Sequence, residues 1–366
     1  MKKRIAVLPG DGIGSEVTAQ AVKVLKAIGN VFDHQFTFEY GQVGAVAIDA
    51  TGDPFPKETE QLCKSSDAIL FGAIGDPKYD NDPSAKVRPE QGLLRMRGEL
   101  GLFSNVRPVV SYPILYDQSP LKDHLLHNVD FVVFRELTGG IYFGKPSGRS
   151  EDGQQAYDTC LYSKKEITRI AVMAFEAATT RKNKVTMVDK ANVLATSRLW
   201  RETVKEIGAS YPEVELEFMF VDNAAMKMIL QPSYFDVILT ENLFGDILTD
   251  EASVIAGSLG LIPSASLGEK HKLYEPVHGS YPQVAGKDIA NPTAAILSAA
   301  MMMEMSFGAK TESKVIVQAV NEAMSRGFVT QDINKARHFG TTEVGDAIVS
   351  LIQSDEMVDF EAETII

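Results

Sequence analysis

The stretch RIAVLPGDGIGSEVTAQAVKVLKAIG, residues 4–29, decides the fold class of this chain. An apolar run leads into a glycine-rich turn, and the segment after the turn repeats apolar residues at helical spacing. We expect a strand, a tight turn and a helix in this order, with Ser15 capping the start of the helix. The residues expected on its buried face are Val17, Ala21, Val24, Leu25 and Ile28. This arrangement indicates an α/β domain.

The glycine turn raises the question of whether it holds a dinucleotide. The Rossmann fingerprint needs glycines at its first, third and sixth positions, for the tight turn, the approach of the pyrophosphate and the packing of helix on strand. Here Gly10, Gly12 and Gly14 take the first, third and fifth positions, and Ser15 takes the sixth. We therefore expect an ordinary strand-to-helix connection in preference to a phosphate site. A nucleotide site has to be sought elsewhere.

Strand-like and helix-like runs alternate along the chain, which indicates an α/β fold with a largely parallel sheet. Helices are expected between the strands and in the segments that close the chain, from Pro292 to Ser354. Residues 138–163 break the alternation with glycines and short β-prone pieces, so we expect an extended arm or hairpin that crosses to a partner subunit or faces solvent. The strand-like runs are RIAVLP, AILFGAI, DFVVFREL, KVTMVDK, LEFMFVD and FDVILTEN.

Composition and charge exclude several classes of protein. The chain has 366 residues, 45% of them apolar, and a formal net charge of −13. Such an acidic surface repels nucleic acid and anionic membranes, so we expect neither as a partner. The longest apolar run, Ala294–Met303, is too short to span a bilayer and is expected to be a buried helix. Cys63 and Cys160, without any CxxC spacing, are expected to be buried side chains and indicate a cytoplasmic protein.

Two aspartates are candidates for metal binding. Asp246 and Asp250 are four residues apart in a helical segment, which puts both carboxylates on one helix face, where they repel each other unless a cation lies between them. Oxygen ligands of this kind suit Mg²⁺ or Mn²⁺. The alternative is a solvated acidic helix face. Asp222 follows a strand, where α/β sheets place ligands, and is a third candidate.

Arginines at the ends of strands and loops indicate a small substrate with several negative charges, because the guanidinium group binds carboxylates through two parallel hydrogen bonds. The arginines of this kind are Arg95, Arg97, Arg107 and Arg135. Ordinary surface ion pairs are the alternative for any one of them. Lys190 ends an apolar strand, where desolvation or a nearby cation lowers the pKa of an amine and suits it to proton transfer.

The segment EPVHGSYPQVAGKDIANPTAA, residues 275–295, combines a strand, a turn, prolines, glycines and a helix start near Asn291 and Pro292. Small residues and exposed backbone N–H groups of this kind suit phosphates and an adenosine. By itself the segment does not identify a nucleotide.

Taken together, these segments match a known family along the whole chain. The matching segments are LPGDGIGSE, EQGLLRMRGELGLFSNVRP, RELTGGIYFG, VDKANVL, ENLFGDILTDEAS and EPVHGSYPQVAGKDIANPTA. The sequence resembles the 3-isopropylmalate dehydrogenases, a branch of the β-decarboxylating dehydrogenases. The resemblance implies NAD-dependent oxidative decarboxylation of 3-isopropylmalate to 4-methyl-2-oxopentanoate and CO₂, a step of leucine biosynthesis in the cytoplasm.

The resemblance also implies roles for the charged residues. Tyr142 would protonate the product carbon, and Lys190 would handle the proton of the substrate hydroxyl. Asp246 and Asp250 would bind Mg²⁺ or Mn²⁺ from one subunit, while Lys190 and Asp222 would reach the same metal and substrate from the other, so the active sites would exist only in a homodimer. The residues expected to hold the substrate carboxylates are Arg97, Arg107 and Arg135.

Substrate choice within the family is expected to depend on the helix before Arg97. Glu90, Leu93 and Leu94 precede that arginine, and the leucines would offer an apolar wall to an isopropyl group. Isocitrate would place a carboxylate there, which is costly to desolvate against leucine. The alternative for the leucines is packing in a helix core, which does not prevent them from also forming the wall.

By resemblance the cofactor is NAD, bound away from the glycine turn, with the Asp76 to Pro89 loop nearby. Where the family usually has a ribose-binding aspartate, this chain has Gln283, which removes the charge that repels a 2′-phosphate. NAD is still favoured, because Gln283 and Val284 replace the lysine and tyrosine of NADP-dependent relatives. The residues expected at the cofactor are Asp76, Glu275, His278, Gly279, Ser280, Tyr281, Pro282, Gln283, Val284, Ala285, Gly286 and Asn291.

The resemblance finally implies the domain organisation: two α/β domains that share a sheet, distinct from a Rossmann fold. The first would be discontinuous, residues 1–103 and 258–366, and the second, residues 104–257, would carry the arm and the dimer interface. Alternative functions are a sister dehydrogenase acting on homoisocitrate or tartrate, a non-catalytic regulatory subunit, and a metal-dependent hydrolase. A regulatory subunit is disfavoured because the residues assigned to catalysis and metal are all present, and a hydrolase does not explain the cofactor segment.

Overall fold

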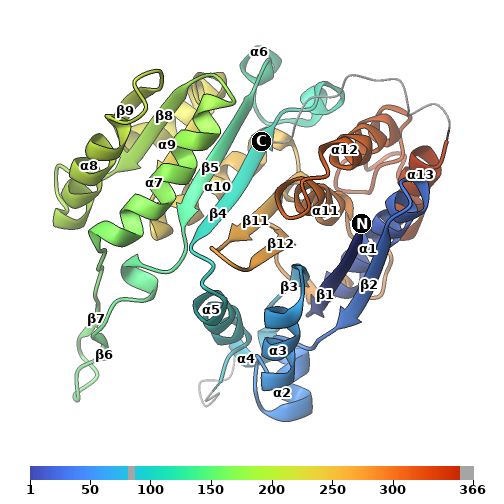
Figure 1. Ribbon diagram of the computed structural model, residues 1–366, viewed down its shortest axis with the longest axis horizontal. Helices are drawn as coiled ribbons and strands as arrows, with labels where there is room; N and C mark the ends of the chain where they lie inside the picture. Colours follow the sequence, from blue (N-terminus) through green and yellow to red (C-terminus); the bar gives the residue numbers. More distant parts are fainter. Residues whose placement is uncertain (81–86, 355–366) are drawn as a thin grey trace. The chain divides into compact units, whose positions relative to one another are not determined.

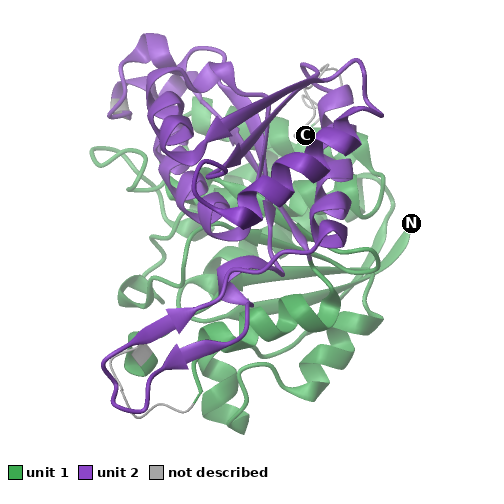
Figure 2. Cartoon of the chain, turned by 90° about the vertical axis from the view of Figure 1, so that its left-hand side faces the viewer, with its two compact units in different colours: residues 1–102, 258–365 green, residues 103–257, 366 purple. Residues whose placement is uncertain are grey.

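The computed structural model of the chain describes residues 1–80 and 87–354, which form two compact units (Figure 2). The first unit combines the chain up to Leu102 with the chain from Ser258 onward, and the second runs from Phe103 to Gly257. These bounds differ by one residue from the expected division at the first crossing and agree with it at the second.

The first unit is an α/β layer structure with the strand order β2-β1-β3-β12-β11 (Figure 1). Pairing is parallel from β2 to β12, and β11 is antiparallel to β12. Its strands are β1 (Lys2–Gly10), β2 (Gln35–Tyr40), β3 (Ala68–Ala73), β11 (Pro263–Leu267) and β12 (Lys272–Pro276). Its helices are α1 (Gly14–Val31), α2 (Ala45–Thr51), α3 (Lys57–Ser65), α4 (Pro77–Asp80), α5 (Pro89–Leu100), α11 (Thr293–Met305), α12 (Lys310–Ser325) and α13 (Thr341–Ile352).

The strand, turn and helix expected at the start of the chain are confirmed as β1 and α1. Every residue expected on the buried face of α1 is fully buried. The expectation that Ser15 caps this helix is wrong, because α1 begins at Gly14 and Ser15 lies inside it. Ile13, the residue before the helix, donates its N–H to the carbonyl of Ser280 at 2.8 Å. A backbone carbonyl of another segment therefore helps to hold the start of α1.

The expectation of a buried helix at Ala294–Met303 is confirmed by α11, whose residues Thr293 to Met303 are all buried. Among the residues that the structure describes, no helix is both long and apolar enough to cross a membrane. Both cysteines are free thiols; Cys63 is buried as expected, whereas Cys160 is only half-buried.

The second unit has the strand order β4-β5-β10-β8-β9, parallel except for the antiparallel pair β4 and β5. All six strand-like runs named from the sequence are strands in the two units, and the α/β fold class is confirmed. The strands are β4 (Ser104–Val110), β5 (Asp130–Glu136), β8 (Lys184–Asp189), β9 (Glu215–Phe220) and β10 (Val237–Thr240). The helices are α6 (Asp123–Leu126), α7 (Lys164–Thr179), α8 (Ala195–Gly208), α9 (Val221–Leu230) and α10 (Asn242–Ala256).

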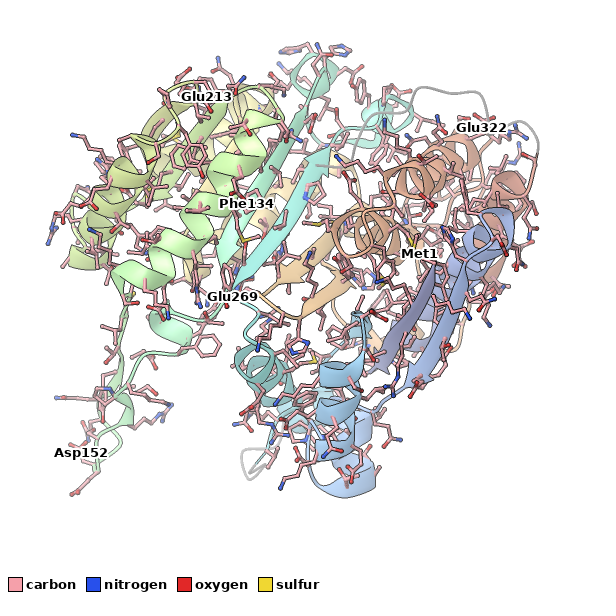
Figure 3. All side chains as sticks on the ribbon, viewed as in Figure 1. Met1, Phe134, Asp152, Glu213, Glu269 and Glu322 are labelled. Atoms are coloured by element: carbon pink, nitrogen blue, oxygen red, sulfur yellow. The ribbon has the colours of Figure 1, made fainter. Side chains whose placement is uncertain are left out.

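Residues 138–163 contain the expected hairpin. Strands β6 (Ser147–Arg149) and β7 (Ala156–Asp158) pair antiparallel and are exposed along their whole length. Figure 3 labels Asp152 in the turn between them. Whether this hairpin reaches a partner subunit stays a prediction.

Helix α10 is oriented by an apolar stripe. Leu248, Ala252 and Ile255 are buried in a core that includes Phe131 and Val133 of β5. Since these residues recur at helical spacing, they turn that side of α10 toward the sheet. Asp246 and Asp250 are on a different side of the same helix, where their carboxylates meet side chains from β4 and β5.

Candidate functional site

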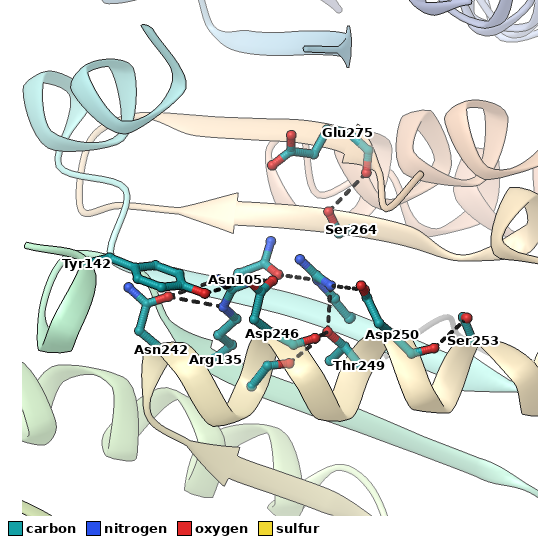
Figure 4. A network of polar contacts seen from close by, with 12 residues as sticks. Asn105, Arg135, Tyr142, Asn242, Asp246, Thr249, Asp250, Ser253, Ser264 and Glu275 are labelled. Atoms are coloured by element: carbon teal, nitrogen blue, oxygen red, sulfur yellow. Dashed lines mark hydrogen bonds and ion pairs between the residues drawn. The ribbon is translucent and has the colours of Figure 1, made fainter. Parts of the chain in front are cut away.

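Arg135, at the end of β5, and Asp246, in α10, form the centre of a polar network (Figure 4). Only 2% of Arg135 is exposed, and its Nη1 pairs with Oδ1 of Asp246. Its Nε and Nη2 donate to Oδ1 of Asn242, at 3.2 and 2.9 Å. A buried guanidinium held on several acceptors has a fixed orientation, which suits recognition of a carboxylate.

A second buried arginine contacts α10 one helical turn beyond the first. Arg107 of β4 is 7% exposed and donates to Oδ1 of Asn105 at 2.6 Å and to Oγ1 of Thr249 at 2.5 Å. Its Nη1 is 3.8 Å from Oδ1 of Asp250. Burial raises the pKa of Asp250; the cation of Arg107 acts in the opposite direction, and the like charge of Asp246 acts in the same direction as burial. The expectation that both aspartates share one face of a helix is confirmed, and the structure adds an arginine beside each of them.

Tyr142 approaches Asp246 from a different segment. Its Oη donates to Oδ2 of Asp246 at 2.9 Å, and the residue is 40% exposed, so the phenol is accessible. The 3₁₀ turn that carries it, Gly140–Tyr142, follows a fully buried carboxylate, Glu136, which accepts from the N–H groups of Thr138 and Gly139 at 3.0 and 2.7 Å. The turn is therefore anchored before the tyrosine.

Lys190 and Asp222 form a separate pair in the second unit. Lys190 directly follows β8, and Asp222 lies in the first turn of α9, so both are at strand ends as expected. The Nζ of Lys190 bonds to Oδ1 of Asp222, which holds the pKa of that carboxyl below its usual range. The neighbour of Lys190 is therefore an anion, where the sequence suggested burial or a cation.

The structure does not bring Asp222 into one metal cluster with Asp246 and Asp250. Within residues 1–80 and 87–354, no three side chains of histidine, cysteine, aspartate or glutamate are arranged to hold a metal ion. The chain by itself supplies two carboxylates on α10 and, separately, the pair of Lys190 and Asp222.

In the first unit, the segment singled out for adenosine lines a cavity of about 460 Å³. Ligand cavities of this size with a mainly apolar lining and a few polar groups are typical of cofactor sites. Five of the expected cofactor residues line it: His278, Gly279, Tyr281, Val284 and Asn291. The others that line it are Ile13, Ser258, Leu259, Gly260, Ile289, Ala290, Gln331, Asp332 and Lys335.

Polar groups of this cavity are partly satisfied by one another. Asp332 accepts from Ser258 Oγ at 2.5 Å and from Asn291 Nδ2 at 3.1 Å. His278 bonds through Nδ1 to the carbonyl of Gly279 at 2.9 Å, whereas its buried Nε2 has no partner in the part of the chain that the structure describes. Burial lowers the pKa of His278, and its Nε2 suits a ligand hydrogen bond.

The glycine turn supports this cavity by packing against the Ser280 loop, and Ile13 of the turn lines it. A Cβ on Gly12, whose φ is +55°, would lie 2.0 Å from the carbonyl oxygen of Ser280, so only glycine allows the two segments to approach. Asp11 accepts from the N–H groups of Ala45, Val46 and Gly75 at 2.9, 3.0 and 2.9 Å. The turn is filled by the protein's own backbone, as the failed fingerprint predicts.

Several expected cofactor residues lie outside the cavity lining. Gln283 is exposed and is not among the lining residues. Its contact with a ribose stays a prediction. Part of the Asp76 to Pro89 loop, residues 81–86, lies outside the described residues. The other expected residues outside the lining are Asp76, Glu275, Ser280, Pro282, Ala285 and Gly286. Sequence reasoning missed Asp332 and Lys335, which carry no motif; only their position in the folded chain reveals them.

Helix α5 carries the residues expected to select the substrate. Arg97 is 9% exposed, with Nη2 3.5 Å from Oε1 of Glu275. Leu93 packs on the core of the first unit, whereas Leu94 is half-buried and lies outside that core. Glu90 is exposed in the first turn of α5. Arg95 forms an exposed ion pair with Asp53. It therefore matches the alternative of an ordinary surface ion pair and not that of a substrate ligand.

A family model described as isocitrate/isopropylmalate dehydrogenase matches residues 4–348. The chain is 54% identical to the 3-isopropylmalate dehydrogenase of Priestia megaterium over 362 residues, covering 98% of each chain. It is 56% identical to that of Geobacillus kaustophilus, covering 95% of each, and 52% identical to that of Bacillus subtilis, covering 98% and 99%.

Solved structures agree with these matches. An isocitrate dehydrogenase from Methylococcus capsulatus superposes with a TM-score of 0.86 at 35% identity, over 96% of this chain and 100% of that chain. A β-decarboxylating dehydrogenase from Thermococcus kodakarensis superposes with a TM-score of 0.80 at 36% identity, over 98% and 99%.

Proposed function

Because the chain belongs to the isocitrate/isopropylmalate dehydrogenase family, we propose that it oxidises and decarboxylates 3-isopropylmalate to 4-methyl-2-oxopentanoate and CO₂, with NAD as hydride acceptor. The observation that carries this proposal is the network of buried arginines and Tyr142 around Asp246 and Asp250. The reaction is a step of leucine biosynthesis. We expect it in the cytoplasm, where the two free cysteines stay reduced.

The substrate has two carboxylates, which suit the buried guanidinium groups. Arg107 and Arg135 would bind them with charge-assisted hydrogen bonds, and their fixed orientation supports this role, because the cost of ordering the side chains has already been met in folding. Arg97 would contribute from helix α5.

A divalent cation fits the donors on α10. Asp246 and Asp250 supply oxygen ligands one turn apart, and the pKa of Asp250 is raised by burial and by the charge of Asp246, a repulsion that a cation relieves. When bound, Mg²⁺ or Mn²⁺ would act as a Lewis acid for negative charge on the substrate oxygens. Asp222 would complete the ligand set from a partner subunit.

The proton transfers would use Lys190 and Tyr142. Bound NAD would supply the hydride acceptor for oxidation of the carbinol carbon, and Lys190 would move the proton released by the substrate hydroxyl. The bond to the departing carboxylate then breaks, CO₂ leaves, and the bonding electrons stay on the neighbouring carbon. The exposed phenol of Tyr142 would donate the proton that this carbon takes up.

The adenosine part of NAD would occupy the 460 Å³ cavity of the first unit. Apolar residues such as Ile13 and Ile289 suit the faces of an adenine, and the unpartnered Nε2 of His278 offers one hydrogen bond to a ligand. Gln283 would bind the adenosine ribose in place of the usual aspartate, with NAD favoured over NADP.

An apolar surface on the second unit supports a homodimer with shared active sites. Large apolar side chains on its surface are more than half exposed: Leu161, Val193, Met226, Leu230 and Ile247. Single exposed apolar residues are normal on a protein surface, whereas a continuous patch is typical of a subunit interface, so the proposal requires these side chains to share one face. Ile247→Asp is expected to give a monomer by sedimentation and to abolish turnover, and a fully active monomer would contradict the shared site.

The first experiment measures formation of NADH and NADPH with Mg²⁺, with 3-isopropylmalate, isocitrate, homoisocitrate and tartrate offered in turn. A much higher kcat/KM for 3-isopropylmalate with NAD is expected, because Leu94 and Leu93 would disfavour the third carboxylate of isocitrate and homoisocitrate and the extra hydroxyl of tartrate. Discrimination between alkyl groups is expected to be weaker, about 1–3 kcal/mol per methylene. Preference for another acid would reassign the substrate, and no activity with any of them would indicate a regulatory subunit.

A further inference from the structure

The side chain of Asn242 joins three segments of the α10 site. Asn242 is the first residue of α10 and is 1% exposed. Its Oδ1 accepts from Nε and Nη2 of Arg135 at 3.2 and 2.9 Å, and its Nδ2 donates to the carbonyl of Gly139 at 3.2 Å. One amide therefore links the end of β5 to the turn that carries Tyr142.

These bonds close a ring of contacts. Arg135 continues from Asn242 to Oδ1 of Asp246, and Tyr142 donates to Oδ2 of the same carboxylate at 2.9 Å (Figure 4). Gly139 precedes Tyr142 by three residues, so the carbonyl that Asn242 holds belongs to the start of the tyrosine's turn. The amide sets both the plane of the guanidinium and the backbone from which the phenol extends.

Asparagine itself is held rigidly. Its backbone N–H donates to Oη of Tyr162 at 2.9 Å, and Tyr162 is 5% exposed. An amide side chain offers an acceptor and a donor on one short, planar group, a combination that neither aspartate nor alanine provides. The described side-chain bonds of Asn242 all go to protein groups.

We propose that Asn242 is a positioning residue that sets Arg135 for substrate binding and the Gly139–Tyr142 turn for proton donation. This inference rests on the proposed roles of Arg135 and Tyr142. Its direct consequence is energetic coupling: loss of the amide costs turnover only while the phenol of Tyr142 is present to be misplaced.

The test is a double-mutant cycle on kcat, measured at saturating substrate, NAD and Mg²⁺, with Asn242→Ala, Tyr142→Phe and the double variant. Asn242→Ala is expected to lower kcat about 10- to 100-fold in the wild-type background and to raise KM for the substrate, since a misplacement of about 1 Å has effects of this size. In the Tyr142→Phe background the further loss in kcat is expected to stay below about threefold.

Asn105→Ala is the matched control, because Asn105 is also a buried amide whose Oδ1 accepts from an arginine, in its case Arg107. Its effect is expected to be the same in both backgrounds. If Asn242→Ala does not fold, Asn242→Asp keeps the acceptor and the volume but loses the donor to Gly139, and the same cycle applies. Additive losses would overturn the inference, whereas a fully active Tyr142→Phe would overturn the role of the tyrosine itself.

Discussion

The glycine turn at residues 9–16 and the helix α10 both stand out in the sequence, yet their surroundings differ. In the turn, a Cβ on Gly10 would lie 1.9 Å from the carbonyl of Ala73, and one on Gly12 would lie 2.0 Å from that of Ser280. In α10, the carboxylates of Asp246 and Asp250 meet arginines and remain partly exposed. The glycines of the turn allow close packing of the backbone, whereas α10 presents charged groups that can bind a ligand.

Buried carboxylates show the same contrast. Asp11 in the turn is surrounded by donors: burial raises its pKa, while bonds from three backbone N–H groups act in the opposite direction. Glu241, directly before α10, has a buried Oε2 without a partner among the described residues, and burial raises its pKa to about 7. Both carboxyls have raised pKa values, but Asp11 accepts hydrogen bonds from three backbone N–H groups, whereas Glu241 keeps a buried oxygen without a partner among the described residues. This difference makes the two regions separable by experiment.

The largest expected effect is the loss of turnover when Lys190 is replaced. Lys190→Ala is expected to lower kcat by about 10³- to 10⁴-fold, because a proton-transfer group is lost, while the dimer persists. The measurement is steady-state turnover together with sedimentation. Lys164→Ala is the matched control, since Lys164 is an exposed lysine paired with a carboxylate, Glu206, at 2.5 Å. Near-normal turnover of Lys190→Ala would remove its assigned role.

Tyr142→Phe is expected to have the next largest effect, a loss of about 10²-fold or more in kcat with little change in stability, because the residue is partly exposed and only its hydroxyl is removed. Stopped-flow or steady-state assays check this, with thermal unfolding in parallel. Tyr157→Phe, on the exposed hairpin, serves as the control and is expected to behave as wild type. Equal rates for the two variants would leave the proton donor unassigned.

In the glycine turn, Gly12→Ala is expected to lower the stability of the protein. The added Cβ meets the Ser280 carbonyl and the backbone has φ +55°, so the free energy of unfolding should fall by about 2–4 kcal/mol. Because the turn supports the cavity loop, KM for NAD is expected to rise while kcat at saturating NAD changes little. Gly98→Ala, a helical glycine with open space around it, is the control and should be neutral or slightly stabilising. A stable Gly12→Ala variant with normal NAD affinity would refute the packing role.

The smallest expected effect concerns Glu241 and pH. Its folded pKa of about 7 lies above the unfolded value near 4.5, so its contribution to stability is present below the unfolded pKa and is lost as pH rises through the folded pKa. Glu241→Gln should therefore gain stability over the wild type between about pH 4.5 and 7, reaching at most about 3 kcal/mol and levelling off above. Urea unfolding at several pH values measures this gain. A gain independent of pH would show that burial of the carboxylate is not its cause.

Much of the fold followed from local patterns. The strand-like runs, the buried stripe of α1, the buried helix α11 and the hairpin within 138–163 all formed as expected, since spacing of apolar residues fixes which side of an element is buried. Strand β2, QFTFEY, was not identified, because its alternation is short and half-exposed. The cap at Ser15 failed because the helix begins one residue earlier, at Gly14, where the backbone bonds of the glycine turn set its start: Gly14 N–H donates to the carbonyl of Asp11 and Ile13 N–H to that of Ser280.

The candidate site divides in the same way. The sequence determined that Asp246 and Asp250 share a helix face, that Lys190 and Asp222 follow strands, and that the glycine turn lacks the dinucleotide fingerprint, because spacing along one element and residue type suffice for each. Only the tertiary structure decided that Asn242 joins Arg135 to the turn of Tyr142, that Asp332 and Lys335 line the cavity, and that Gly12 is packed against Ser280. These are contacts between segments far apart in the chain, and no local pattern encodes which backbone carbonyl or side chain will fold against another.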